Sequence, residues 1–182
     1  LLQESGYYFS KVKLSKKENV NNTIDLILDI DLGSKAFINE IIFTGNKKFK
    51  KNKLLNIITS EENKFWKLIS NKKLLNKQRI ALDRRLLESY YKNKGYYKVN
   101  ILDEAIQYDN NDNFKLVFNI NAGEKFYFNQ FDIDLPEDYD LSYFQKIIKK
   151  LNTFSGKRYS YKVIDKMLTE IEKIATDKQY EF

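Results

Sequence analysis

The feature that most constrains the fold of this chain is an internal repeat. The segment Ile24–Gly33 recurs as Phe114–Gly123, at an offset of 90 residues. Apolar and polar side chains alternate in both copies, which predicts two strands that each bury one face. The expected core-facing residues are Ile24, Leu26, Leu28 and Ile30 in the first copy and Phe114, Leu116, Phe118 and Ile120 in the second. Self-similarity at a fixed period predicts tandem copies of one small repeat.

The similarity continues in both directions from these strands. Downstream, Phe37–Ile41 corresponds to Tyr127–Phe131, so each repeat is expected to open with a strand. Upstream, Gly6-Tyr7-Tyr8 corresponds to Gly95-Tyr96-Tyr97, one residue out of register. Asparagine-rich turns are expected at 21–22 and 109–113. Residues 1–8 are typical of a helix end followed by this junction, so we expect the chain to start inside a repeat.

One complete repeat follows from these matches. We expect strands at 36–44, 97–106 and 114–121 and helices at 51–58 and 76–94. The order β-α-α-β-β predicts an α+β fold, in which two helices cover one face of a three-stranded sheet. The predicted domains are 1–35 (a helix end and a hairpin), 36–125 (complete), and 126–182, with helices at 139–151 and 160–178 but without its last two strands.

The second helix and its end carry the clearest local signals. Leu82, Leu86 and Tyr90 lie four residues apart and predict a buried stripe, with Leu87 beside it. Gly95 is expected to end the helix at positive φ, which costs glycine least. A strand is expected to begin almost without a loop at Tyr97.

Asp83 falls inside the apolar sector of that helix. A buried carboxylate needs hydrogen-bond donors, so we expect a structural bond to a backbone N–H or a tyrosine hydroxyl. A catalytic acid is the alternative, but no partner for one is evident.

Composition excludes several classes of chemistry. The chain has no cysteine and no histidine, which removes disulfides, thiol catalysis, zinc–thiolate sites and the usual general base. We find no nucleophile–base pair, phosphate-binding glycine loop or ligand cluster, so we predict no catalytic, cofactor-binding or metal-binding residues. No apolar stretch approaches the roughly 20 residues that span a bilayer, which predicts a soluble chain.

The net charge of +7 raises the possibility of an acidic partner. Five lysines cluster in one predicted loop: Lys47, Lys48, Lys50, Lys51 and Lys53. Because acidic residues are spread throughout, we interpret the excess charge as background and keep a nucleic-acid module as an alternative. Trp66, the single tryptophan, is expected in the core, with an interface anchor as the other interpretation.

The order of these motifs resembles the POTRA (polypeptide-transport-associated) domain of outer-membrane protein assembly factors. The residues that carry the resemblance are Ile41–Asn46 with Phe49, then Phe65-Trp66, Asp83–Tyr91 and Gly95-Tyr96. Such proteins carry a row of POTRA repeats, and the complete repeat here resembles the third of them. The residues before it resemble the end of the second repeat, and the residues after it resemble most of the fourth. The matching structural residues are Gly45, Asn46, Asp83, Gly95 and Tyr96. The last repeat departs from the pattern, with Gln179 at the junction glycine and Met167 at the Asp83 position.

The resemblance implies a periplasmic, non-enzymatic scaffold beside a C-terminal membrane barrel absent here. Such scaffolds receive unfolded outer-membrane β-barrel proteins and hold accessory lipoproteins, without nucleic acid. It further implies a mixed sheet whose second strand is an edge. An extended client segment would pair with that edge as an additional strand, flanked by Lys98, Asn100, Leu102 and Glu104. The alternative is that the strand is a solvated edge without a partner. Other POTRA proteins remain alternatives: two-partner secretion transporters, autotransporter assembly factors and organellar import barrels.

Overall fold

The computed structural model describes residues 2, 5–64, 66, 70–107 and 113–180. The chain divides into two compact units, the first formed by 1–87 with 101–120 and the second by 88–100 with 121–182. Three sequence predictions lie partly or wholly outside the described residues: the helix end at the N-terminus, the place of Phe65, and most of the turn at 109–113.

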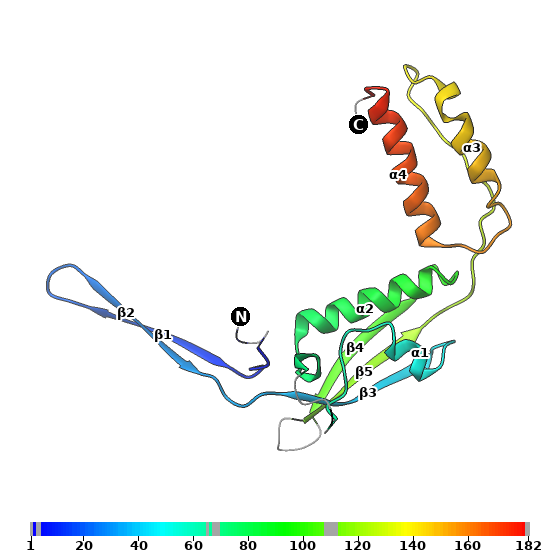
Figure 1. Ribbon diagram of the computed structural model, residues 1–182. Coiled ribbons are helices and arrows are strands. Elements are labelled where there is room, and N and C mark those ends of the chain that lie inside the picture. Colours follow the sequence, from blue (N-terminus) through cyan, green and yellow to red (C-terminus); the bar gives the residue numbers. More distant parts are fainter. Residues whose placement is uncertain (1, 3–4, 65, 67–69, 108–112, 181–182) are drawn as a thin grey trace. The chain divides into compact units, whose positions relative to one another are not determined.

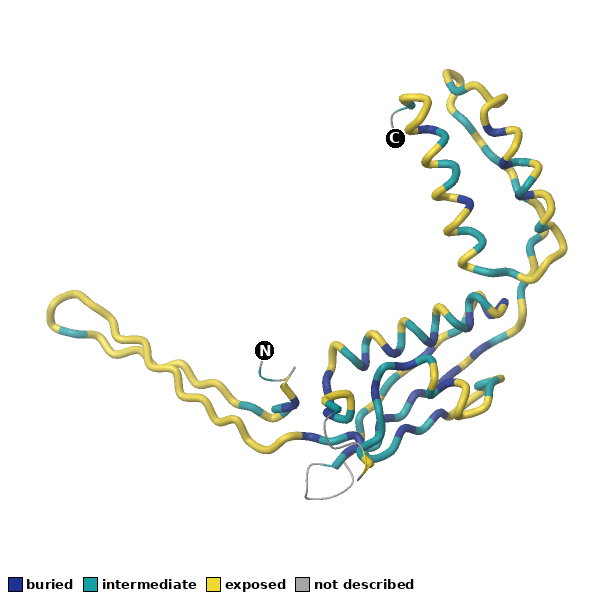
Figure 2. The backbone as a smooth tube through the Cα atoms, viewed as in Figure 1, coloured by how far each residue is buried: buried dark blue, intermediate teal, exposed yellow. Residues whose placement is uncertain are grey.

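The first unit contains an antiparallel hairpin of β1 (Lys11–Glu18) and β2 (Ile24–Asp31). Val12 lies opposite Ile30 and Leu14 opposite Leu28. The predicted strand is confirmed, but its predicted burial is wrong, because every residue of both strands is exposed (Figure 2). Alternation determines which side chains share a face, whereas burial needs a second layer. Within the described residues, no second layer covers the apolar face of this hairpin.

The complete sheet contains β3 (Phe37–Asn46), β4 (Asn100–Gln107) and β5 (Asn113–Asn121) (Figure 1). The order is β3-β5-β4, so β5 is central. Here the predicted core face is confirmed, since Phe114, Leu116, Phe118 and Ile120 are all 4% exposed or less. Phe118 stacks on Phe43 with ring centroids 5.7 Å apart.

Two α-helices and a short 3-10 turn connect β3 to β4. They are α1 (Lys51–Leu55), η1 (Asn71–Lys73) and α2 (Lys77–Lys92). The first is shorter than expected, because Asn56 and Ile57 form a turn at its end. In Figure 1, α2 lies along one face of the sheet, as expected for an α+β fold with a mixed three-stranded sheet.

The buried stripe of α2 differs from the predicted one. Ile80, Asp83, Leu87 and Tyr91 are 5% exposed or less, whereas Leu82 is 38% exposed. The helix is rotated about its axis by roughly one residue relative to the pattern of leucines. The physical reason is Asp83, whose hydrogen bonds hold it at the centre of the buried face.

The second unit contains η2 (Leu141–Phe144), α3 (Gln145–Asn152) and α4 (Tyr161–Asp177). Its core consists of Phe144, Ile147, Leu151 and Met167. The strand expected at 127–131 is reduced, within the described residues, to one bridge between Tyr127 and Arg158. A longer strand needs a neighbour along its length, and no described strand pairs with this segment.

The end of α4 adopts a left-handed backbone conformation at a residue other than glycine. Gln179 has φ 59° where the complete repeat has glycine, and the Tyr180 N–H donates to the Ala175 carbonyl at 3.0 Å. The side chain of Ser160, the cap residue of α4, makes no capping hydrogen bond to the start of the helix. Instead, the Lys162 N–H donates to Oδ1 of Asn93 at 2.7 Å. Asn93 follows α2, so a residue of the predicted repeat 36–125 caps a helix of the predicted repeat 126–182.

Candidate functional site

The candidate site is the edge strand β4. The sheet order places it at one side with β5 as its neighbour. The strand begins at Asn100, three residues later than expected, because the preceding backbone forms turns. The Tyr97 N–H donates to the Gly95 carbonyl, and the Val99 N–H donates to the Tyr96 carbonyl. Within the described residues, no hydrogen bond joins another segment to the outer edge of β4.

Three of the four predicted client-binding residues lie on one face of β4. Asn100, Leu102 and Glu104 are all exposed. Lys98 is exposed but lies before the strand, with its ammonium nitrogen 5.5 Å from the centre of the Phe126 ring. Sequence reasoning missed Ile106, which is 42% exposed on the same face as Leu102. The alternation of two residues that placed Leu102 would also have found it.

The other face of β4 lies toward α2. Ile101 is 2% exposed, and Asp103 accepts a hydrogen bond from the Arg84 guanidinium at 2.9 Å. Side chains of Arg84 and Asp103 are 41% and 22% exposed, so the ion pair reaches solvent. The two faces of the strand therefore differ. The open face carries Asn100, Leu102, Glu104 and Ile106, whereas the face beside α2 carries Ile101 and Asp103.

The opposite edge of the sheet, β3, is covered. The Asn63 N–H donates to the Ile38 carbonyl at 2.6 Å, and the Ile41 N–H donates to a carboxylate oxygen of Glu62 at 3.1 Å. Ile38 and Ile41 are both buried although they are three residues apart, so the alternation is interrupted between them. The Asn63 amide and the Glu62 carboxylate therefore occupy main-chain groups at this edge.

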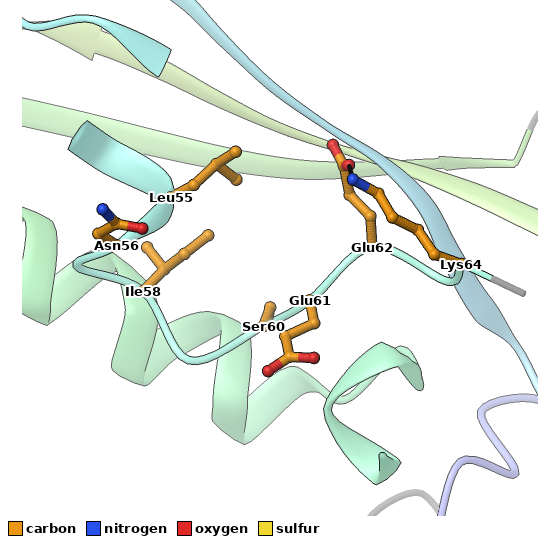
Figure 3. Close-up of a pocket in the computed structure, with 7 residues that line it drawn as sticks. All are labelled: Leu55, Asn56, Ile58, Ser60, Glu61, Glu62 and Lys64. Carbon is orange, nitrogen blue, oxygen red and sulfur yellow. Dashed lines mark ion pairs between the residues drawn. The ribbon is translucent and has the colours of Figure 1, made fainter. Parts of the chain in front are cut away.

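Glu62 is stabilised as a carboxylate at this covered edge. Partial burial raises its pKa, but the Ile41 N–H and the ammonium groups of Lys51 and Lys64 outweigh that effect and lower the pKa overall. The two ammonium nitrogens lie 3.2 and 3.3 Å from its oxygens. Figure 3 shows Lys64 beside Glu62 at a hollow of about 240 Å³. Glu62 is therefore present as the carboxylate that accepts the Ile41 N–H at neutral pH.

Asp83 joins α2 to the loop after α1. Its Oδ1 accepts hydrogen bonds from the Thr59 N–H at 2.6 Å and the Thr59 hydroxyl at 2.7 Å. Its Oδ2 accepts from the Ser60 N–H at 3.1 Å. The carboxylate is fully buried, so its oxygens face donors of this loop and not a substrate. In the last repeat, buried Met167 occupies this position.

The remaining structural residues lie at turns. Gly45 has φ 76°, and an added β-carbon would lie 2.5 Å from the Ile120 carbonyl oxygen. Asn46 is the last residue of β3. Gly95 has φ 95°, and Tyr96 is 7% exposed, with its N–H donating to the Tyr91 carbonyl at 3.0 Å. The hydrogen bond from the Tyr96 N–H to the Tyr91 carbonyl closes α2 in the manner expected for a helix that ends at glycine.

Two further predictions concern exposed residues. Trp66 is 62% exposed, so the prediction of a core position is wrong. It lies in the loop beyond Asn63, where its ring is 5.6 Å from the Lys64 ammonium nitrogen. In the lysine cluster, Lys47 donates to the Phe43 carbonyl and Lys51 pairs with Glu62, so these two side chains bind within the protein.

The described residues contain no group of three or more acidic side chains arranged to hold a metal ion. None of the described helices has both the length and the apolar character needed to span a membrane. What the site offers is a strand edge with one open face of alternating apolar and polar side chains and one face beside α2.

Comparison with known proteins identifies the fold. Residues 36–123 match the model of the POTRA family, described as a surface antigen variable number repeat. The chain is 28% identical over 151 residues to the outer membrane protein assembly factor BamA of Neisseria meningitidis, covering 83% of this chain and 19% of that protein. It is 22% identical over 171 residues to BamA of Buchnera aphidicola, covering 93% and 27%. The chain therefore spans about a fifth to a quarter of these relatives.

A solved structure has the same fold. The crystal structure of POTRA domains 3–5 of Haemophilus influenzae BamA matches with a TM-score of 0.63 and 13% identity, covering 94% of this chain and 64% of that one. At this identity the match concerns the fold alone.

Proposed function

Because residues 36–123 belong to the POTRA family, we propose that this chain is part of the periplasmic scaffold of a BamA-like outer-membrane protein assembly factor. The proposal is for a binding protein and not for an enzyme. Its clients are unfolded outer-membrane β-barrel proteins, and a membrane barrel of the same protein is its neighbour. The observation that carries the proposal is the contrast between the closed β3 edge and the open β4 edge.

Client segments bind by adding a strand to β4. Main-chain N–H and C=O groups along this edge supply the affinity, which makes binding tolerant of client sequence. No proline interrupts the strand, so its N–H groups remain available to pair. Asn100, Leu102 and Glu104 flank the added strand, while Lys98 lies before it and contributes less.

Accessory lipoproteins dock on another surface of the same scaffold. Trp66 is a suitable anchor because an exposed tryptophan supplies a large contact area at small entropic cost. Replacing Trp66 by alanine is expected to weaken lipoprotein binding without affecting peptide binding at β4. Equal weakening of both would contradict the separation of the two surfaces.

The test of strand addition uses a peptide from the terminal strand of an outer-membrane β-barrel protein, titrated into the ¹⁵N-labelled chain. Amide shifts are expected at 100–107. Two N-methylated versions of the peptide provide the control, one methylated at odd and one at even positions. Only one edge of an added strand pairs with β4, so one version is expected to lose binding and the other to retain it. Shifts confined to the lysine cluster, or equal binding by both versions, would overturn the proposal.

A further inference from the structure

The exposed face of β4 carries two apolar side chains in register. Leu102 and Ile106 are 61% and 42% exposed and lie four residues apart, which places them on the same side of the strand. Glu104 lies between them on this side and is also exposed. The side chains point away from α2, because the intervening residues Ile101 and Asp103 lie on the helix side.

A strand added to β4 brings its side chains alternately to these two sides. It would lie about 4.8 Å from β4, with each residue beside one of the residues of β4. Residues of one parity would pack beside Leu102 and Ile106. Residues of the other parity would lie beside the buried Ile101, the half-buried Ala105, and Asp103 with its ion pair to Arg84 at 2.9 Å. A shift of one residue would exchange the two sets.

The two sides therefore favour different residues in a client. Apolar side chains beside Leu102 and Ile106 remove apolar surface from water, whereas the same side chains beside the Arg84–Asp103 pair would displace its solvent. Opposite Glu104, a basic or neutral residue fits better than an acidic one, because like charges directly opposite destabilise a strand pair.

On the basis of the proposed function, we propose that Leu102 and Ile106 make the β4 edge selective for amphipathic strands. The ligand class is an extended segment whose apolar residues alternate with polar ones, held with its apolar side on the face of the sheet that α2 leaves open. Leu102 and Ile106 determine which set of alternate client residues lies on the open face of the sheet. The main-chain hydrogen bonds of the β4 edge supply the affinity.

The test compares two synthetic nonapeptides of the same composition, capped with lysines. One alternates valine and threonine, and the other places the valines together. Dissociation constants are measured by amide shifts for the unchanged chain, for the double variant Leu102→Ser/Ile106→Ser, and for the matched control Val12→Ser/Leu14→Ser on β1. All four side chains are exposed, so the free energy of unfolding should change little in either variant.

We expect the unchanged chain to bind the alternating peptide more tightly, and the β4 variant to lose about three- to tenfold of that affinity. The β1 control should lose none. If the alternating peptide shifts the β4 amides but binds the β4 variant as tightly as the unchanged chain, the selectivity is overturned while strand addition stands. An equal loss in the β1 control overturns it as well. If neither peptide shifts the β4 amides, strand addition itself fails.

Discussion

The hairpins β1–β2 and β4–β5 share one sequence pattern and differ in their surroundings. In β5 the alternating residues are buried, with Leu116 at 0% exposure. In β2 the corresponding Leu26 is 63% exposed. Both hairpins form, so alternation is sufficient to define the strand and the face. The helices and β3 account for burial in the second hairpin, and the first has no such layer within the described residues.

The first hairpin depends more on its cross-strand pairs as a result. On one side of it, Lys11, Lys13 and Lys17 lie directly opposite Asp31, Asp29 and Asp25. Such pairs contribute only a few tenths of a kcal/mol to about 1 kcal/mol each. The hairpin β1–β2 is therefore stabilised by many weak cross-strand contacts, whereas β4–β5 is stabilised mainly by its buried core residues.

The strongest test of this difference is one substitution made at both equivalent positions. Leu116→Ala is expected to lower the free energy of unfolding by about 2–5 kcal/mol, because it leaves a cavity in the core. Leu26→Ala is expected to change it by less than about 0.5 kcal/mol, because the side chain is already in water. Denaturant unfolding measures the change in the free energy of unfolding for each of the two variants. Similar shifts of the midpoint would mean that β2 is buried in solution.

A second test uses what the hairpins have in common. Gly6 and Gly95 precede them with φ 91° and 95°, and added β-carbons would lie 2.8 Å from Leu74 and 2.7 Å from Arg158. Gly95→Val is expected to cost about 1–2 kcal/mol of unfolding free energy, because a left-handed conformation disfavours side chains. Gly33→Ala is the control at φ 61°, with no heavy atom within 4 Å and a smaller expected cost. An unchanged midpoint for Gly95→Val would refute the assignment of this helix end.

A third test addresses the charged side of β1–β2. Asp29→Lys places two lysines opposite each other, since Lys13 is its partner in the register. We expect a loss of about 0.2–1 kcal/mol, confined to this hairpin and reduced by salt. Amide hydrogen exchange measures it locally. The exchanged pair Lys13→Glu with Asp29→Lys should restore protection, and a failure to restore it would exclude pairing as the cause.

The smallest expected effect concerns pH and the closed edge of the complete sheet. The pKa of Glu62 is lowered in the folded chain, so its stabilising contribution is present above its unfolded pKa and is lost as the pH falls through the folded value. Hydrogen exchange of the Ile41 amide should therefore become less protected at acidic pH, after correction for intrinsic rates. The variant Glu62→Gln should show a weaker pH dependence, and an equal dependence would implicate another group.

The element order of the complete repeat was predictable from sequence because its signals are local. The glycine junction and the alternation of β5 need only neighbouring residues to be read. The orientation of α2 was not predictable, because it depends on Asp83 meeting donors from a loop 23 and 24 residues earlier. The leucines alone indicated a different face.

The open edge was partly predictable. The resemblance indicated that the second strand is an edge, and the alternation gave Leu102 and Glu104. What closes the other edge was not predictable, because it needs the carboxylate of Glu62 to reach the Ile41 N–H across 21 residues. Trp66 was placed wrongly for a similar reason, since average burial says nothing about one particular loop.

The cap that Asn93 supplies to α4 determines where this chain can be divided. A fragment that begins at residue 126, the boundary expected from the repeats, would lack Asn93 and would leave the Lys162 N–H without its acceptor. The second compact unit already includes residues 88–100, which agrees with this dependence. A fragment of the last repeat should therefore begin before Asn93, because the side chain of that residue caps α4.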